Sequence, residues 1–306
     1  MAPQSVPVRS LEQMVDVVRG RQVPVKVVVA ACADANAVLA CTEAWRQGLA
    51  EPVLVGDIEH MKAMPELKGI DFTQFACHHA PDLGESMKVS LELLETGAAR
   101  FLMKGGVKTD VLLRAVLGRK RGGEGLLSHI GVFGHPREER LVIVTDAGVN
   151  IEPTLTRKID IIKNAVAVAV KLGMSPAKVA VLSATEKVSY QGMESSRDAD
   201  ILARLCRMGI FGDAQVGGPF ALDIAVSGDK ARAKGVEHPV AGHADILCAP
   251  NIVAGNVLYK SVTSLMDLPM AGIVIGASYP LVVPSRGDSD LSKFYALALA
   301  AYLSAP

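Results

Sequence analysis

A short polar stretch near the end of the chain, PSRGDSD at residues 284–290, combines hydroxyls, a guanidinium and two carboxylates at a predicted strand-to-helix junction. Asp288, Ser289 or Asp290 could cap the helix, because a side-chain oxygen accepts a hydrogen bond from an unpaired backbone N–H. Such a cap does not need Arg286, since a positive charge is disfavoured near a helix N-terminus unless an anion is also there. A capped turn explains the stretch by itself, but Arg286 also makes it a candidate anion site.

A second candidate is KGGVKTDVLLR at residues 104–114, where another predicted strand leads into a helix. Its glycine pair would let the backbone approach a ligand closely, and Thr109 or Asp110 could cap the helix. Arg114 follows one turn later on the same face. The alternative interpretation of Arg114 is an ordinary surface arginine.

Two further loops carry polar groups beyond what capping requires. Asp146 and Asn150 in TDAGVNIEPT follow an apolar strand, and they either shape the turn or contact a ligand. In APNIVAGNVLYK, Gly255 and Asn256 stand where a helix is predicted to begin, and helix N-termini bind phosphate through free N–H groups. Lys260 follows Asn256 by one turn. An ordinary cap by asparagine is the alternative here.

Together these loops predict an anion pocket, because open α/β sheets bind ligands at the carboxyl ends of their strands. Other chemistries are poorly supported. The chain has no P-loop motif, no G-x-G-x-x-G after its first strand, no H-E-x-x-H and no G-x-S-x-G. His78 and His79 are adjacent and therefore point apart, so we expect no metal site.

Strands and helices alternate along most of the chain, which predicts parallel βαβ units. The first strand, VPVKVVVAAC, leads to Asp34, which is predicted to cap a helix that runs through Arg46. Residues 126–148 break the alternation, because two apolar runs flank the polar turn HPREER with no helix between them. This segment predicts a hairpin, and a domain boundary is expected nearby.

The composition suits a large buried core, with 50% hydrophobic residues and enough length, 306 residues, for two domains. The 32 Lys and Arg residues balance the 32 Asp and Glu residues. The most basic run, GRKRGG at residues 118–123, is interpreted as a solvated loop. Nucleic acid is therefore not expected as a partner, since it requires a concentrated basic surface.

The cysteines and the N-terminus indicate a reduced, cytoplasmic protein. Five cysteines without a C-x-x-C pair suggest neither a disulfide framework nor a zinc site. The N-terminal residues lack the apolar core of a signal peptide, and no apolar segment is long enough for a membrane span.

Taken together, these motifs resemble the phosphate acetyl/butyryl transferase family over nearly the whole chain. The most specific parts are the phrase PVAGHADIL followed by PNIVAGNVLYK, and the late Ser-Arg pair. The other matching segments, in chain order, are VLVGD, FLMKGGVKTDVLLRAVL, VTDAGVNIEPT and KVAVLSATEK.

The resemblance implies two α/β/α domains with mostly parallel sheets, an architecture like that of isocitrate and isopropylmalate dehydrogenases, and an active-site cleft between them. The first domain would comprise residues 1–137 and 278–306, and the second residues 138–277. The resemblance also implies no metal and no tightly bound cofactor, acyl-CoA and phosphate as substrates, and a homo-oligomer of two or more chains.

The implied reaction is reversible: acyl-CoA and phosphate give acyl phosphate and CoA by direct transfer in a ternary complex. Arg286 and Arg114 would clamp the phosphate, because guanidinium forks match its oxygens. Ser285 matches the family serine, whose hydroxyl would bond the sulfur. A carboxylate would take the thiol proton, and we favour Asp288 over Asp290 for this role. The other expected substrate-binding residues are Thr109, Gly255, Asn256 and Lys260.

Two departures favour the butyryltransferase-like branch, although both acetyl and butyryl groups remain candidates. In the acetyltransferase branch the catalytic aspartate lies about two turns after the Ser-Arg pair. This chain instead has Leu291, Ser292 and Lys293 there, and its S-R-x-D-S pattern resembles the butyryl branch. An additional arginine of the acetyltransferases also has no counterpart in ESMKVSLELL.

Two other functions stay open. A module that binds CoA or acyl phosphate without turnover would fit the missing late aspartate. An NAD(P)-dependent dehydrogenase of the same architecture would need a metal-binding set of aspartates, and no clear carboxylate cluster is present in the sequence.

Overall fold

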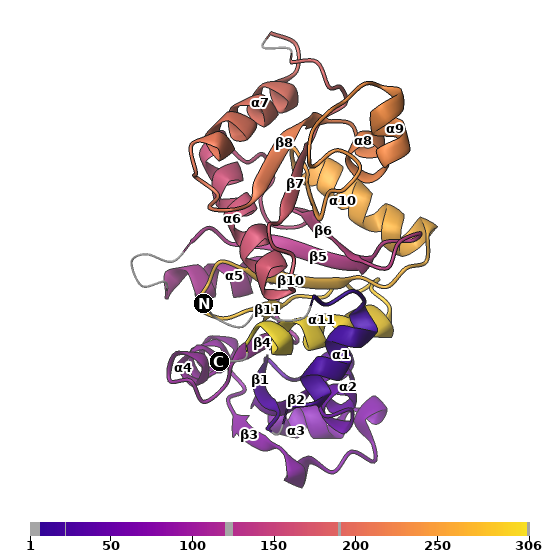
Figure 1. The fold of residues 1–306 in the computed structure, drawn as a ribbon. Helices are drawn as coiled ribbons and strands as arrows, with labels where there is room; N and C mark the ends of the chain where they lie inside the picture. The colour runs from indigo at the N-terminus through magenta and orange to yellow at the C-terminus, as the bar shows by residue number, and fades with distance from the viewer. Residues whose placement is uncertain (1–6, 22, 120–124, 189–190, 305–306) are drawn as a thin grey trace. The chain divides into compact units, whose positions relative to one another are not determined.

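The computed structural model describes residues 7–21, 23–119, 125–188 and 191–304, and Figure 1 shows their fold. The chain divides into two compact units. The first unit comprises residues 11–125 and 269–306, and the second comprises residues 1–10 and 126–268.

The divisions come earlier in the chain than the predicted boundaries after residues 137 and 277. The reason for the first shift is strand pairing, because β5 (Ser128–Gly134) forms an antiparallel pair with β6 (Leu141–Thr145). A boundary at residue 137 would separate these two strands. The predicted hairpin within residues 126–148 is thereby confirmed.

The first unit is built on a mostly parallel sheet. Its strand order is β3-β2-β1-β4-β11-β10. The strands are β1 (Val25–Ala30), β2 (Ala50–Gly56), β3 (Ala76–His79), β4 (Phe101–Lys104), β10 (Ala271–Ile275) and β11 (Leu281–Val282). Only β10 runs antiparallel to its neighbour β11, so the C-terminal segment adds a hairpin beside β4.

The centre of this sheet is apolar on both faces, as expected for strands covered by helices. In β1, residues 27–30 are fully buried, and Val28 lies beside Val53 of β2 and Leu102 of β4. These contacts confirm the parallel arrangement predicted from the apolar runs.

Helices complete the first unit. They are α1 (Leu11–Arg19), α2 (Ala35–Arg46), α3 (Ile58–Ala63), α4 (Leu83–Glu95), α5 (Thr109–Gly118) and α11 (Asp290–Leu303), with short 3-10 turns at Pro65–Leu67 and Phe72–Gln74. The helix α11 contacts α1, α2 and β10, and residues 295–301 within it are all buried (Figure 1). Its buried, almost wholly apolar surface anchors the residues that precede it.

The second unit has the strand order β5-β6-β9-β7-β8, and its strands are parallel apart from the β5–β6 pair. The other strands are β7 (Lys178–Leu182), β8 (Gln215–Phe220) and β9 (Ile246–Cys248). Its helices are α6 (Leu155–Lys171), α7 (Glu194–Arg207), α8 (Leu222–Val226), α9 (Gly228–Ala233) and α10 (Ile252–Lys260), which continues as a π-helical turn at Ser261–Leu265.

The structure bears on two predictions made from the sequence, one about membrane spans and one about the basic run. Among the described residues, no helix is both long and apolar enough to cross a membrane. The basic run at residues 118–123, expected to be a solvated loop, falls mostly on residues 120–124, which lie outside the described part of the chain.

Candidate active site

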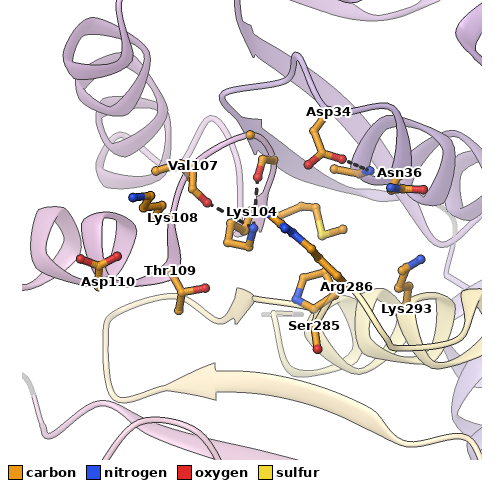
Figure 2. Close-up of a pocket in the computed structure, with 15 residues that line it drawn as sticks. Asp34, Asn36, Lys104, Val107, Lys108, Thr109, Asp110, Ser285, Arg286 and Lys293 are labelled. Atoms are coloured by element: carbon orange, nitrogen blue, oxygen red, sulfur yellow. Dashed lines mark hydrogen bonds between the residues drawn. The ribbon is translucent and has the colours of Figure 1, made fainter. Parts of the chain in front are cut away.

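A pocket of about 620 Å³ opens in the first unit, where β1, β4 and β11 end. Three loops form its wall, and each of them follows one of these strands (Figure 2). The lining residues are Asp34, Asn36 and Ala37 after β1, residues 103–110 around the end of β4, residues 284–286 after β11, and Lys293 of α11. This is the edge at which α/β sheets bind ligands.

The stretch 284–290 forms a closed turn that presents Ser285 and Arg286 on the pocket wall. The carboxylate of Asp288 accepts a hydrogen bond from the backbone N–H of Ser285 at 2.8 Å, and the backbone N–H of Asp288 donates to the carbonyl of Ser285 at 3.1 Å. Of the three residues that could have capped α11, Ser289 is the one that does so.

Asp288 therefore shapes the turn, and it is not among the residues that line this pocket. Its predicted role as a base stays a prediction. The catalytic roles assigned to Ser285 and Arg286 also stay predictions, although both side chains lie on the pocket wall.

The glycine pair in the loop after β4 packs against the loop after β1, and both glycines line the pocket. The backbone N–H groups of Gly105 and Gly106 donate to the carbonyls of Ala30 and Ala31 at 2.9 and 2.7 Å. A Cβ at Gly105 would clash with both carbonyl oxygens. The pair thus allows a close approach between two loops of the pocket wall, and its predicted approach to a ligand stays a prediction.

The helix α5 begins at this pocket without a side-chain cap. Its N-cap residue is Lys108, whose side chain makes no capping hydrogen bond, so neither Thr109 nor Asp110 is the cap that the sequence suggested. The first N–H groups of a helix have no partner within it and carry a partial positive charge. Thr109 lines the pocket at this point, so the helix end adds to the positive potential there.

Lys104 lines the pocket, and no sequence motif indicated a role for it. Its ammonium donates to the carbonyls of Gly105 and Val107, both at 3.2 Å (Figure 2). Burial lowers the pKa of Lys104, while nearby Asp34 raises it and nearby Arg286 lowers it. Its place at the last position of β4 was the available signal, since strand ends form the ligand-binding edge.

Arg114 makes an exposed ion pair with Asp110, one helical turn away. The distance between Nη2 of Arg114 and Oδ2 of Asp110 is 2.6 Å, and Nε of Arg114 also donates to the carbonyl of Asp110 at 3.2 Å. Arg114 does not line the pocket. This geometry matches the surface-arginine alternative, and its predicted role in clamping phosphate stays a prediction.

The residues predicted on α10 belong to the second unit and pack that helix onto the loop after β6. Asn251 is the N-cap, so α10 begins earlier than the sequence suggested. A Cβ at Gly255 would clash with the carbonyl oxygen of Asp146. The amide of Asn256 donates to the carbonyl of Ala147 at 3.3 Å. Both residues therefore have structural roles, and their substrate contacts stay predictions.

Lys260 and the Asp146 loop complete the list of sequence candidates. The ammonium of Lys260 lies 5.1 Å from the ring centroid of Tyr259, and its substrate contact stays a prediction. The buried carboxylate of Asp146 accepts hydrogen bonds from three backbone N–H groups and from the amide of Asn150. Asp146 and Asn150 therefore shape the turn, which was one of the two roles considered for them.

The charges that line the pocket are Lys104, Lys108, Arg286 and Lys293 against Asp34 and Asp110. Within the described residues, Arg286 makes no ion pair, whereas Lys293 is paired with Asp290 at 3.0 Å. No group of three or more His, Cys, Asp or Glu side chains in the described part of the chain could hold a metal. The arrangement is suited to binding an anion with several oxygens, such as phosphate.

Comparisons with known proteins agree with this chemistry. Residues 83–301 match the family model described as phosphate acetyl/butaryl transferase. A phosphate butyryltransferase of Clostridium acetobutylicum is 37% identical over 300 residues, which cover 97% of this chain and 99% of that protein. A phosphate acetyltransferase of Thermotoga maritima is 36% identical over 299 residues, which cover 95% of this chain and 98% of that protein.

A solved structure is similar over almost the same extent. The branched-chain phosphotransacylase from Enterococcus faecalis V583 superimposes with a TM-score of 0.80 and 29% sequence identity. The match covers 91% of this chain and 99% of that one.

Proposed function

Because the chain belongs to the phosphate acetyl/butyryl transferase family, we propose that it transfers a short-chain acyl group reversibly between CoA and inorganic phosphate. The observation that carries this proposal is the pocket of the first unit. It combines Arg286, Lys104 and the uncapped start of α5 on one wall.

These groups supply what a phosphate or acyl phosphate needs. The guanidinium of Arg286 can bond two phosphate oxygens at once. The ammonium of Lys104 and the N–H groups at the start of α5 add positive charge at fixed positions. Because they are in place before the reaction, they also stabilise the negative charge that develops as the acyl group moves.

The hydroxyl of Ser285 provides a donor on the same wall. Its Oγ accepts a hydrogen bond from the backbone N–H of Gly287 at 3.4 Å, which leaves its own O–H able to donate to the thioester sulfur or carbonyl oxygen. Holding phosphate and thioester together in this way would supply much of the rate enhancement by proximity.

Direct transfer between the two substrates is supported by the state of the cysteines. No cysteine lines the pocket, and burial raises the pKa of Cys32 to about 12. A thiol of such high pKa is a poor nucleophile at neutral pH. We propose a ternary complex without an acyl-enzyme, and no tightly bound cofactor. The five free cysteines are also consistent with a reducing, cytoplasmic setting.

For the acyl group we favour butyryl or a similar short chain. The pocket wall includes the apolar side chains of Ala37, Met103, Val107 and Pro284. One methylene in an apolar pocket is worth only about 1–3 kcal/mol of discrimination. We therefore expect both acetyl-CoA and butyryl-CoA to be substrates, with different values of kcat/KM. We also propose a homo-oligomer, as the family resemblance implies, which light scattering of the purified protein would test.

The test of the proposed function is release of free CoA thiol from acetyl-, propionyl- and butyryl-CoA with and without phosphate. We expect release only with phosphate, and loss of Arg286 to lower kcat/KM by roughly 100- to 1,000-fold. Arg46→Ala is the matched control, because Arg46 is an exposed arginine of the same unit paired with Glu43 at 3.9 Å.

The outcome also separates the alternative functions. If the folded protein binds CoA and phosphate but consumes no acyl-CoA, the non-catalytic binding module replaces the transferase. If instead NAD(P)H forms from a hydroxy acid, the dehydrogenase reading is revived.

A further inference from the structure

Two carboxylates line the pocket, Asp34 and Asp110, and only Asp34 is available for chemistry there. Asp110 is held by Arg114 at 2.6 Å. Asp34 stands at the start of α2, where its Oδ1 accepts a hydrogen bond from the backbone N–H of Ala37 at 3.0 Å. Within the described residues, its Oδ2 makes no hydrogen bond, so one of its two oxygens remains for a ligand.

Asp34 caps α2 and also lines a pocket that contains several cations. Figure 2 shows its carboxylate on the pocket wall formed by the start of α2, in the same pocket as Lys104 and Arg286. Asp34 and Arg286 both act on the charge of Lys104, so these three groups share one electrostatic environment. A carboxylate that served only as a cap would not need to lie among the cations of a ligand pocket.

The reaction needs a proton acceptor at this place. In the direction from acyl phosphate to acyl-CoA, the nucleophile is the CoA thiol, and a free thiol has a pKa of about 8.5. Most of it is therefore protonated at neutral pH. The carboxylate that the sequence favoured, Asp288, accepts a hydrogen bond from the backbone N–H of Ser285 and does not line this pocket.

We propose that Asp34 is the general base of the acyl transfer, an inference that rests on the proposed function. The free oxygen of its carboxylate takes the thiol proton as the sulfur attacks the acyl carbon and the C–S bond forms. The C–O bond to phosphate then breaks, and its electron pair leaves with the phosphate oxygen. Asp34 returns the proton to that oxygen, so hydrogen phosphate is released and the carboxylate is regenerated. In the opposite direction the same steps run backwards.

The charges around Asp34 suit this cycle. Lys104, Arg286, Lys108 and Lys293 line the same pocket, while Asp110 is held in its ion pair with Arg114. Arg286 and Lys104 would hold the phosphate whose oxygen receives the proton. Asp34 would thus lie beside both the entering thiol and the leaving phosphate.

The two roles of Asp34, as helix cap and as proposed base, can be tested separately with one substitution. Asn caps a helix about as well as Asp, so Asp34→Asn keeps the hydrogen bond to α2 but removes the base. Asp82→Asn is the matched control, because Asp82 caps α4 in the same way, with a hydrogen bond from the backbone N–H of Glu85 at 2.9 Å, and does not line the pocket. Asp288→Asn tests the competing carboxylate. Thermal unfolding of each variant shows that it is folded, and Asp34→Ser serves as a second cap-preserving change.

The assay is acyl-CoA formation from acyl phosphate and CoA across pH 6 to 9. For Asp34→Asn we expect kcat to fall roughly 100- to 10,000-fold, with the KM for acyl phosphate within about threefold of the wild type. The remaining rate should rise about tenfold per pH unit until the thiol ionises near pH 8.5, because the solvent must then supply the thiolate. Asp82→Asn should keep the wild-type kcat and pH profile.

Three results would overturn the assignment: wild-type kcat in Asp34→Asn, a lowered kcat with an unchanged pH profile, or the steep pH profile in Asp288→Asn instead. Failure of the proposed function itself is distinct, since the wild-type protein would then form no acyl-CoA at any pH.

Discussion

The two units of the molecule each contain a pocket at the ends of their strands, but the charges in these pockets are handled differently. In the second unit, a pocket of about 320 Å³ is lined by Lys158, and this lysine makes an ion pair of 2.9 Å with Asp198. Both side chains are almost completely buried. Thr154 caps α6 and Asn251 caps α10 beside them.

In the pocket of the first unit, three polar groups lack such partners among the described residues. Arg286 makes no ion pair within the described residues, one oxygen of Asp34 has no hydrogen bond there, and α5 starts without a side-chain cap. Charges that are paired inside the chain hold a fold together, whereas charges that face a pocket without such partners can bind a ligand. The contrast supports the proposed chemistry in the first pocket and a structural role for the ion pair in the second.

The largest expected effect is the loss of stability when the buried ion pair between Lys158 and Asp198 is removed. Removing Lys158 leaves the carboxylate of Asp198 buried, with Arg197 at 3.6 Å as its remaining ion-pair partner among the described residues. We expect Lys158→Ala to lower the free energy of unfolding by about 3–5 kcal/mol in urea denaturation. A change below about 1 kcal/mol would mean that the pair is not structural, and the contrast between the two pockets would lose its basis.

The next effect concerns Lys104, the corresponding cation of the first pocket. In the described part of the chain its ammonium bonds only carbonyls of its own loop, so Lys104→Ala should leave the free energy of unfolding nearly unchanged. We expect the KM for phosphate to rise about 10- to 100-fold, as a hydrogen bond to a charged group is worth about 1.5–3 kcal/mol. Initial rates at varied phosphate measure this, and an unchanged KM together with a large loss of stability would reverse the two assignments.

The smallest expected effect is a change in stability and in the KM for phosphate at alkaline pH, where Lys104 loses its proton. Burial lowers the pKa of Lys104, with Asp34 raising it and Arg286 lowering it. The folded pKa thus lies below the unfolded value, so protonated Lys104 costs stability at neutral pH. This cost disappears as the pH rises from the lowered pKa toward about 10.4.

Phosphate binding should follow the opposite course over the same range, because it needs the protonated ammonium. We expect the KM for phosphate to rise several-fold below the pH of about 10.4 at which an ordinary lysine loses its proton, because the pKa of Lys104 is lowered. Lys104→Arg should flatten this rise, since the guanidinium stays charged. A wild-type KM that is constant over this range would show that Lys104 does not act through its charge.

Much of the fold could be predicted because the sequence pattern is local and regular. The apolar runs of β1 and β4 and the cap of α2 by Asp34 follow from short-range rules, and the structure has them. The hairpin β5–β6 could be found from the lack of a helix between two apolar runs. The predicted domain boundaries differ from the division into compact units, which keeps the paired strands β5 and β6 together.

The site was harder to predict, because it depends on which side chains point into one pocket. Ser285, Arg286 and Thr109 were predicted from their places after strands, and all three line the pocket, while their roles stay predictions. Asp34 was recognised only as a cap, since no local pattern shows that it lines the same pocket as residues after β4 and β11.

Arg114 shows the opposite difficulty. Its spacing from Asp110 predicts an ion pair along the helix, and the structure has that pair. Its role at the phosphate came from the family resemblance, which carries no information on the direction of this side chain.

A crystal structure with inorganic phosphate bound would test most directly the claim that the first pocket binds the phosphate. The account predicts phosphate oxygens within hydrogen-bond distance of Arg286, of Lys104 and of the first N–H groups of α5. Phosphate seated instead beside Lys158 in the second unit, with the first pocket holding only water, would contradict it.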